Sequence, residues 1–223
     1  MSDFATMRRM MVDGQIRPSD ITDPHLIDAM LDIPREVFLP AGKSALAYLD
    51  QDLPVGGAGE GGAIRRMLKP MVMAKMIQAL DLAEADHVLD VGCLTGYSSA
   101  ILGRLAGSVV ALEEDTFLAS EARAALAKTG AANVKVVQGR LAEGWRAEAP
   151  YDAILVNGAV EIPPEVLLGQ LRDGGRLACV LGTGPATKAV LYRKDLGDVG
   201  GRPIFDAVAP ALPGFAAPKV FVF

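Results

Sequence analysis

One stretch of the chain, Val88–Glu113, constrains the fold more than any other, because it combines two apolar runs, a glycine turn and a helix. The first run contains Asp90 and breaks at Gly92, and the turn closes at Gly96. The second run ends on a carboxylate, Glu113. This order predicts two neighbouring parallel strands with a ligand site at their carboxyl ends. It suits a nucleoside, so we expect a nucleotide-like cofactor.

The spacing of the glycines distinguishes two classes of cofactor. A dinucleotide fingerprint, G-x-G-x-x-G, would hold a pyrophosphate at the helix N-terminus, but Leu94 stands where its middle glycine would be. The chain instead reads D-x-G-x-x-x-G over Asp90–Gly96, which resembles motif I of the S-adenosylmethionine-dependent methyltransferases. The resemblance implies that Glu113 accepts hydrogen bonds from the cofactor's ribose hydroxyls. An ordinary tight strand-to-helix turn is the alternative.

Composition indicates a globular chain that is large enough to be an enzyme. The 223 residues, 51% of them hydrophobic and 22% charged, can bury a core without disulfides. The formal net charge is −5 and no basic stripe is present, which disfavours a nucleic-acid partner.

Cysteine and histidine usage bears on the compartment and on metals. Cys93 and Cys179 cannot form a disulfide framework, and no signal peptide or membrane-spanning run is visible. We therefore expect a reduced, cytoplasmic protein with no membrane partner. The only histidines, His25 and His87, are not spaced with cysteine for zinc, so no metal site is predicted.

Apolar periodicity predicts helices before an α/β region. Helices are expected over 3–13, 24–31 and 70–82, and the glycine-dense run 56–62 is expected to be a mobile loop. The elements expected after it are strands at 88–91, 109–112, 134–137, 153–156 and 176–181, helices at 98–105, 118–128 and 164–170, and a closing strand pair at 189–193 and 220–223. This alternation predicts a mostly parallel sheet with both faces covered. We expect one domain, 1–223, with a helical N-terminal region at 1–82 and a cofactor-binding core at 83–223.

Short motifs along nearly the whole chain resemble one family, the protein-L-isoaspartate O-methyltransferases. They are Met11-Val12 with Gln15-Ile16, Asp28–Met30, Pro34–Pro40, Ala47–Asp50, Leu53–Gly56, Gly144-Trp145, Ala149–Ile154, Ile162-Pro163, Gln170-Leu171 and Gly174–Leu177. The resemblance implies a seven-stranded Rossmann-like methyltransferase sheet whose last hairpin is antiparallel. It also implies S-adenosylmethionine as cofactor and, as substrate, the carboxylate of an isoaspartyl residue in a damaged protein.

The chain departs from this family at three places. Family members have a threonine-isoleucine-serine-x-proline segment whose hydroxyl lies at the reacting carboxylate, and the matching residues here are Arg66–Pro70, with Leu68 in place of the hydroxyl. Motif I has Leu94 instead of a glycine, and the adenine-side glycine-aspartate-glycine segment reads Gly139–Leu141. A leucine facing a carboxylate offers it no hydrogen bond. We therefore expect little methylation of isoaspartyl peptides.

These matches indicate which residues form the site. Leu68 and Lys69 are the candidates for the substrate segment, and Arg65, Arg66 and Lys69 are interpreted as a solvated basic loop, with contact to an acidic substrate as the alternative. Arg140 either meets the adenine or pairs with a surface acid. The candidate cofactor-binding residues are Asp90, Gly92, Cys93, Gly96, Glu113, Arg140, Leu141 and Asn157.

Three functions are compatible with the sequence. The first is an S-adenosylmethionine-dependent O-methyltransferase that acts on a protein or peptide carboxylate, or on a small-molecule acceptor if the acceptor has changed. The second is a degenerate relative that keeps the fold, has weak or absent catalysis, and acts as a binding module. The third is a nucleotide-sugar or dinucleotide enzyme, against which the glycine spacing counts.

Overall fold

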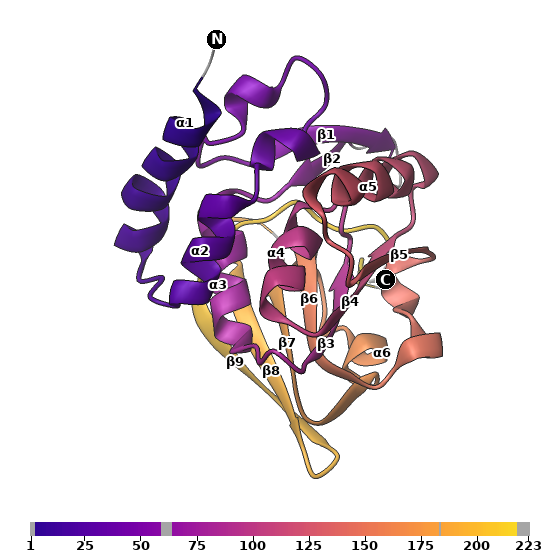
Figure 1. Cartoon of the computed structure of the whole chain (residues 1–223). Helices are drawn as coiled ribbons and strands as arrows, with labels where there is room; N and C mark the ends of the chain where they lie inside the picture. The colour runs from indigo at the N-terminus through magenta and orange to yellow at the C-terminus, as the bar shows by residue number, and fades with distance from the viewer. Residues whose placement is uncertain (1–2, 59–63, 183, 218–223) are drawn as a thin grey trace, which may run out of the picture.

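The computed structural model describes residues 3–58, 64–182 and 184–217, and Figure 1 shows their arrangement around a central sheet. The sheet has seven strands in the order β5-β4-β3-β6-β7-β8-β9. Their bounds are His87–Val91 (β3), Ser108–Glu113 (β4), Val134–Gln138 (β5), Tyr151–Val160 (β6), Leu171–Leu181 (β7), Lys188–Asp195 (β8) and Asp198–Asp206 (β9). Strands β3 to β7 pair in parallel, and β8 and β9 are antiparallel. The predicted seven-stranded, mostly parallel α/β fold is confirmed.

Two cores lie on opposite faces of the sheet because successive strand residues point to opposite sides. On β3, Val88 belongs to the first core and Leu89 to the second. Side chains of α3 (Pro70–Leu80), α4 (Tyr97–Leu105) and α5 (Thr116–Thr129) fill the first core. The second is covered by the short α6 (Glu165–Leu168), by the 3₁₀ turn at 141–143, by Trp145 and Ala149 on either side of the 3₁₀ turn at 146–148, and by residues that follow β9.

The N-terminal region adds helices to the first core. Helix α1 (Phe4–Met11) continues as a π-helical turn, Val12–Ile16, and a 3₁₀ turn, Arg17–Ser19. Helix α2 (Pro24–Asp32) begins after Asp23, whose carboxylate accepts from the backbone amides of the first turn. Further 3₁₀ turns lie at 35–38 and 44–46.

The glycine-dense run is not a loop throughout. Strand β1 (Leu53–Ala58) pairs antiparallel with β2 (Ile64–Met67) as a separate two-stranded sheet, so the loop prediction was wrong for Gly56, Gly57 and Ala58. The register shifts on both sides of Gly56, whose φ of +100° a side chain would rarely adopt. Glycine here makes bulges within a strand. Residues 59–62 of the predicted loop lie outside the described residues.

The closing strand pair also differs from the prediction. The partner of β8 is β9, a strand that the sequence analysis missed because glycines and a proline interrupt its apolar pattern. Gly201 is required there, since a Cβ would lie 2.6 Å from the Tyr192 ring. The predicted strand at 220–223 lies outside the described residues.

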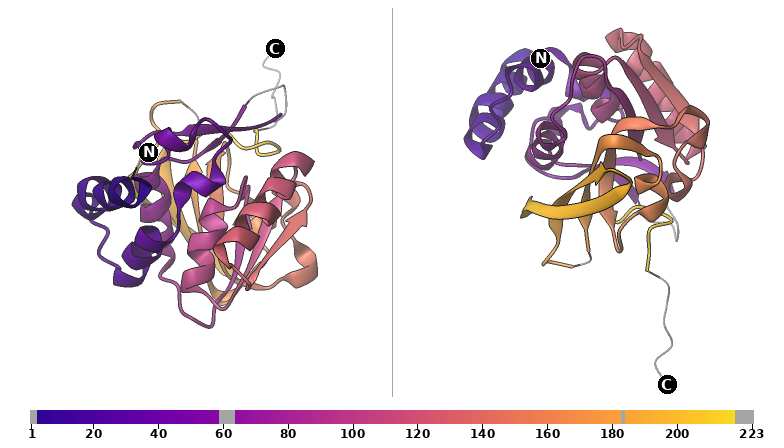
Figure 2. Two further views of the ribbon diagram at one scale, coloured as in Figure 1. Left: turned by 45° about the horizontal axis from the view of Figure 1, so that its top comes forward. Right: turned by 90° about the horizontal axis from the view of Figure 1, so that it is seen from below.

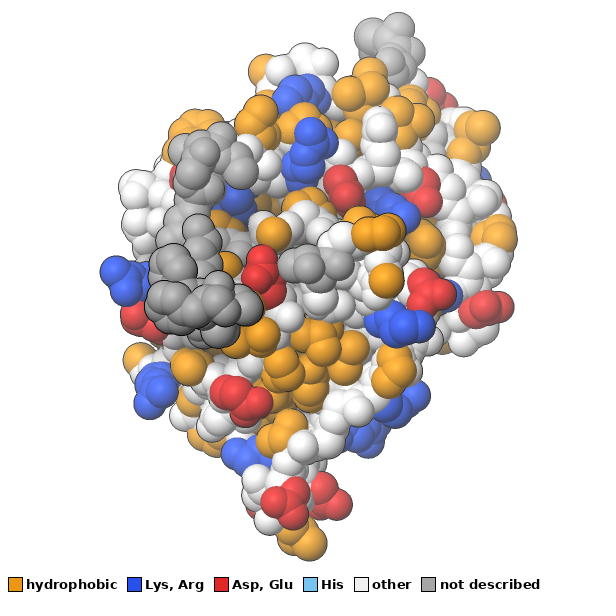
Figure 3. Space-filling view, turned by 180° about the vertical axis from the view of Figure 1, so that it is seen from behind, with side chains coloured by type: hydrophobic (Ala, Val, Ile, Leu, Met, Phe, Trp, Pro, Cys, Tyr) orange, Lys and Arg blue, Asp and Glu red, His pale blue; other side chains and the backbone are white. Residues whose placement is uncertain are grey.

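The residues after β9, Ala207–Ala217, are called the C-terminal segment below. In both views of Figure 2 the yellow end of the described chain lies near the β1–β2 sheet, and in the left view both cross the same end of the central sheet. Seen from behind, acidic and basic side chains are interspersed over the molecule (Figure 3). Among the described residues, none of the helices is long and apolar enough to cross a membrane.

Candidate functional site

The turn after β3 is tight and contains three residues with left-handed backbone. Gly92, Leu94 and Gly96 have φ angles of +74°, +55° and +95°. The amides of Gly92 and Cys93 both donate to the Leu112 carbonyl of β4, at 2.9 and 3.1 Å. A left-handed residue with a side chain costs about 1–2 kcal/mol. Leu94 therefore keeps the turn that a glycine would make, although with strain and with its side chain buried.

Glu113, at the end of β4, is fully buried and has its hydrogen-bonding capacity filled from within the chain. Its Oε1 accepts from the amides of Glu114 and Asp115, at 3.0 and 3.1 Å, and its Oε2 accepts from the Leu94 amide at 2.9 Å. The Arg65 guanidinium adds two bonds, Nη1 to Oε1 at 3.0 Å and Nη2 to Oε2 at 3.3 Å. A carboxylate offers about four acceptor positions. All are used.

Arg65 reaches Glu113 from β2, and its side chain is only 5% exposed. Strand β2 alternates, so that Arg65 and Met67 point inward and Ile64 and Arg66 point to solvent. The prediction of a solvated loop was therefore wrong for Arg65, and the sequence analysis missed its role. The available signal was the carboxylate itself, because a buried Glu113 requires a cation nearby.

The C-terminal segment covers the glycine turn. The Ala159 amide of β6 donates to Pro210 (2.8 Å), and the Leu212 amide donates back to the Ala159 carbonyl (2.9 Å). These bonds place the Leu212 side chain over the strand ends, where a Cβ at Gly92 would lie 3.2 Å from Leu212 Cδ2 and one at Gly158 only 2.5 Å from Leu212 Cγ. No local pattern in the sequence predicts this contact.

Asp90 is fully buried within a polar cluster on the other side of the turn. Its Oδ2 accepts from the Ser98 and Ser99 hydroxyls, at 2.8 and 2.5 Å, and its Oδ1 accepts from the Asn157 amide. Burial raises the pKa of the Asp90 carboxyl from 3.8 to about 6, although these three donors oppose the rise. The two predicted cofactor residues Asp90 and Asn157 are therefore hydrogen-bonded to each other.

Three further predicted cofactor residues have different surroundings. Cys93 is buried, and burial raises the pKa of its thiol well above the usual value, so the thiol is not activated. Leu141 is buried, and its amide lies 3.4 Å from the Glu114 carboxylate. Arg140 is exposed and pairs with the surface acid Glu143 at 3.5 Å.

The substrate-segment candidates lie between β2 and α3. The Leu68 side chain is 2% exposed and packs in the first core, while its carbonyl accepts from Arg35 Nη2 at 2.7 Å. Lys69 immediately precedes α3, and its amide donates to the Asp52 carboxylate at 2.9 Å. Neither backbone position is free to adjust without breaking one of these bonds.

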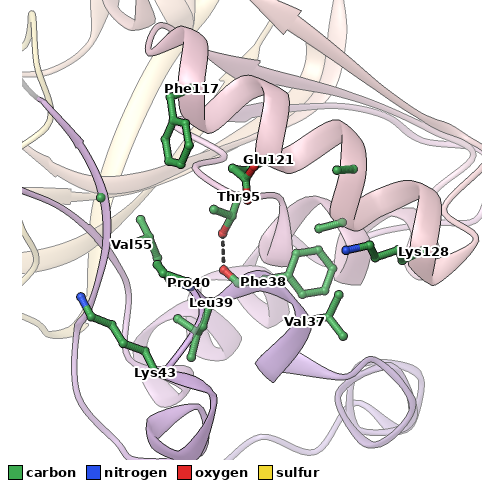
Figure 4. A pocket seen from close by; sticks show the side chains of 13 residues that line it. Val37, Phe38, Leu39, Pro40, Lys43, Val55, Thr95, Phe117, Glu121 and Lys128 are labelled. Carbon is green, nitrogen blue, oxygen red and sulfur yellow. Dashed lines mark hydrogen bonds between the residues drawn. The ribbon is translucent and has the colours of Figure 1, made fainter.

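A groove of about 300 Å³ opens beside the turn, between the 37–43 segment, β1 and α5. Figure 4 shows its mainly apolar lining, whose charged side chains are Lys43, Glu121 and Lys128. Thr95, from the glycine turn, donates its hydroxyl to the Phe38 carbonyl at 2.6 Å and so ties the groove wall to the turn.

Metal ligands do not gather in the described ranges, where no three His, Cys, Asp or Glu side chains are placed to hold an ion. His87 bonds through its two ring nitrogens to Ser108 Oγ (2.7 Å) and to the Glu148 carbonyl (3.1 Å). It also stacks on Tyr151. Both ring nitrogens and the ring face of His87 are therefore used in contacts within the protein.

The cofactor that the sequence resemblance implies, S-adenosylmethionine, does not fit the site in this arrangement. The ribose would need acceptor positions on Glu113 that five donors already fill. The space in front of Gly92 contains Arg65 Nη2, 3.4 Å from a Cβ position there, and Leu212. The residue types at the site suit the cofactor, but the side chains of Arg65 and Leu212 occupy the space that it would need.

Comparisons with known proteins agree on one family. The model of the family described as "Protein-L-isoaspartate(D-aspartate) O-methyltransferase (PCMT)" matches residues 7–202. A protein-L-isoaspartate O-methyltransferase 1 of Rhodopseudomonas palustris (strain HaA2) is 38% identical over 200 residues, covering 89% of this chain and 79% of the relative. One from Methanoregula boonei is 39% identical over 188 residues, 84% of each chain.

Solved structures support the fold. A protein-L-isoaspartate O-methyltransferase superposes with a TM-score of 0.79 at 25% identity, over 94% of this chain and 65% of that one. This chain thus spans about two thirds of that protein. A Plasmodium falciparum structure that contains S-adenosyl-L-homocysteine has a TM-score of 0.78 at 17% identity, over 95% of this chain and 99% of that chain. At that identity the likeness concerns the fold alone.

Proposed function

Because the chain belongs to the protein-L-isoaspartate(D-aspartate) O-methyltransferase family, we propose that it is an O-methyltransferase whose acceptor is a protein or peptide carboxylate. S-adenosylmethionine is the cofactor of this family. The observation that carries the proposal is the placement of Glu113 beside the left-handed Gly92, at the neighbouring carboxyl ends of β4 and β3. A cytoplasmic location, with Cys93 and Cys179 as free thiols, is part of the proposal.

The acceptor is proposed to differ from an isoaspartyl residue. Leu68 stands where the family has its hydroxyl, and its side chain is buried in the first core. A carboxylate beside it would receive no hydrogen bond, a loss of about 1.5–3 kcal/mol for a charged acceptor. A peptide carboxylate bound in another way, or a small-molecule carboxylate, would avoid that loss.

A second candidate function is a binding module without catalysis. The ion pair between Arg65 and Glu113 and the contact of Leu212 with the turn support it, since both oppose cofactor binding. A degenerate relative would keep these contacts permanently.

Calorimetry with S-adenosylhomocysteine and a methyl-ester assay test the proposal together. We expect weak binding, in the micromolar to millimolar range, and little methyl ester on an isoaspartyl peptide. Leu68→Ser should raise ester formation by up to about tenfold for each 1.4 kcal/mol of restored stabilisation of the transition state. Leu68→Ala is the matched control, because it makes a similar truncation without a hydroxyl.

The outcomes separate the candidates. Cofactor binding with no ester on isoaspartyl peptides, but with ester on another carboxylate, supports the changed acceptor. Robust wild-type activity on an isoaspartyl peptide contradicts that part. Absence of binding at millimolar ligand, in the wild type and in variants that truncate Arg65 or Leu212, leaves only the binding module.

A further inference from the structure

The crevice outside β3 and β4 contains an arginine side chain. In open parallel sheets, ligands bind in the crevice beyond the carboxyl ends of the strands, where neighbouring connections diverge. Strand β3 is that point here, because it pairs with β4 on one side and β6 on the other. The Arg65 guanidinium lies in this crevice, bonded to Glu113 and close to Gly92.

We propose that Arg65 and Leu212 act as an intramolecular competitor for the cofactor, so that the cofactor binds only when both side chains leave the glycine turn. The inference rests on the proposed function and concerns the regulation of the same site. It assigns Arg65 the ribose position on Glu113 and Leu212 the space above Gly92 and Gly158.

The guanidinium imitates what the ribose would offer. Two parallel N–H donors on one planar group meet the two carboxylate oxygens of Glu113, as a pair of neighbouring hydroxyls would. The two occupants cannot be present together, because the remaining acceptor positions are held by three backbone amides. Cofactor binding must therefore break the ion pair.

The two competing groups are held with different strength. Arg65 is attached through a long side chain on β2, so rotation of that side chain alone would free Glu113. Leu212 is fixed through the backbone: the C-terminal segment bonds to Ala159 twice, and the Glu161 amide donates to the Phe215 carbonyl at 3.0 Å. Leu212 also packs in the second core. We therefore expect Leu212 to move less readily.

The competition has a measurable consequence. When only a fraction of molecules has the site open, the apparent dissociation constant equals the intrinsic constant divided by that fraction. Removing the competitor raises the open fraction and tightens binding without any new contact to the ligand. A residue that only supported the site would weaken binding when removed, so the direction of the change distinguishes the two roles.

The test is S-adenosylhomocysteine binding, measured by calorimetry and by the ligand-induced rise in Tm, on the full chain and its variants. Arg65→Ala should bind at least tenfold more tightly than the wild type. Leu212→Ala should also bind more tightly, and the double variant more tightly than either. Arg65→Gln, which stays polar but loses the charge, takes the place of Arg65→Ala if that variant does not fold.

Two matched variants serve as controls. Arg104→Ala breaks an arginine–carboxylate pair of 2.8 Å that is exposed to solvent, and Val208→Ala truncates an exposed residue of the same C-terminal segment. Both should bind like the wild type.

The outcomes also distinguish this inference from the proposed function. Measurable binding by the wild type, with no tightening in the Arg65 and Leu212 variants, overturns the competitor and leaves the methyltransferase standing. Absence of binding by every variant at millimolar ligand overturns both.

Discussion

The buried carboxyl of Asp90 should make the stability of the fold depend on pH in a specific window. Its pKa is raised by burial from 3.8 to about 6, and the two values differ by about two. Each pKa unit corresponds to 1.36 kcal/mol, so the difference is worth about 3 kcal/mol. Asp90→Asn tests this, because a neutral amide can still accept from Asn157 and donate to a serine hydroxyl.

The sign follows from the two ionisation states. At about pH 4 and below, folding leaves the Asp90 carboxyl protonated and adds no penalty. Between about pH 4 and pH 6 the unfolded chain ionises this carboxyl while the folded chain keeps it protonated, so the free energy of unfolding falls by about 3 kcal/mol and then stays constant above about pH 6. Asp90→Asn removes this term. The variant should therefore gain about 3 kcal/mol relative to the wild type between about pH 4 and pH 7.

Urea unfolding across this pH range measures the difference between wild type and variant, which cancels the titration of the other groups. Asp198→Asn, at an exposed position of the β8–β9 hairpin, is the control and should follow the wild type. A pH-independent difference for Asp90→Asn would refute the raised pKa. A difference that changed in the opposite direction would show that the three hydrogen bonds outweigh burial.

Two further predictions concern the contacts that close the site. Gly158→Ala places a Cβ 2.5 Å from Leu212 Cγ and 2.8 Å from the Pro210 carbonyl oxygen, so it should lower the free energy of unfolding by about 1–3 kcal/mol. Gly200→Ala is the control, because a Cβ there would have no atom of the described residues within 4 Å. Equal effects of the two substitutions in urea unfolding would contradict the contact. Arg65→Ala leaves Glu113 buried without its cation and should lower the free energy of unfolding by about 3–5 kcal/mol. Glu113→Gln in the double variant should restore part of that loss. A loss as small as that from breaking the exposed Arg104–Asp32 pair, about 1 kcal/mol or less, would be evidence against a buried ion pair.

The fold could be predicted from the sequence where local pattern and tertiary environment agree. The buried runs of β3, β4 and β6 are apolar because both faces of those strands are covered, and this is the pattern that periodicity detects. The prediction at β1 failed for the opposite reason. Its Gly56 and Gly57 have no strand propensity, and the strand forms because it pairs with β2.

The site could be predicted in part. The turn at Gly92 and the carboxylate of Glu113 are local in sequence, and the structure brings them together at adjacent strand ends. The roles assigned to the individual cofactor residues stay predictions. Arg65 and Leu212 could not be found in the same way. Arg65 lies 48 residues from Glu113 in sequence and reaches it through pairing of β2 with β1, whereas Leu212 reaches Gly92 and Gly158 through pairing of the C-terminal segment with β6.

Two residues that bear on the proposed function lie in one short stretch, β2 and the residues after it. Arg65 pairs with Glu113, the proposed cofactor-site carboxylate, and Leu68, three residues later, stands where the family resemblance places a hydroxyl beside the acceptor. A fully buried carboxylate such as Glu113 needs a cation nearby to offset the cost of desolvation. Arg65 meets that need, and under the proposal the same ion pair makes cofactor binding competitive. A change in this one stretch can therefore alter both the cofactor affinity and the choice of acceptor while the sheet that positions Glu113 stays the same.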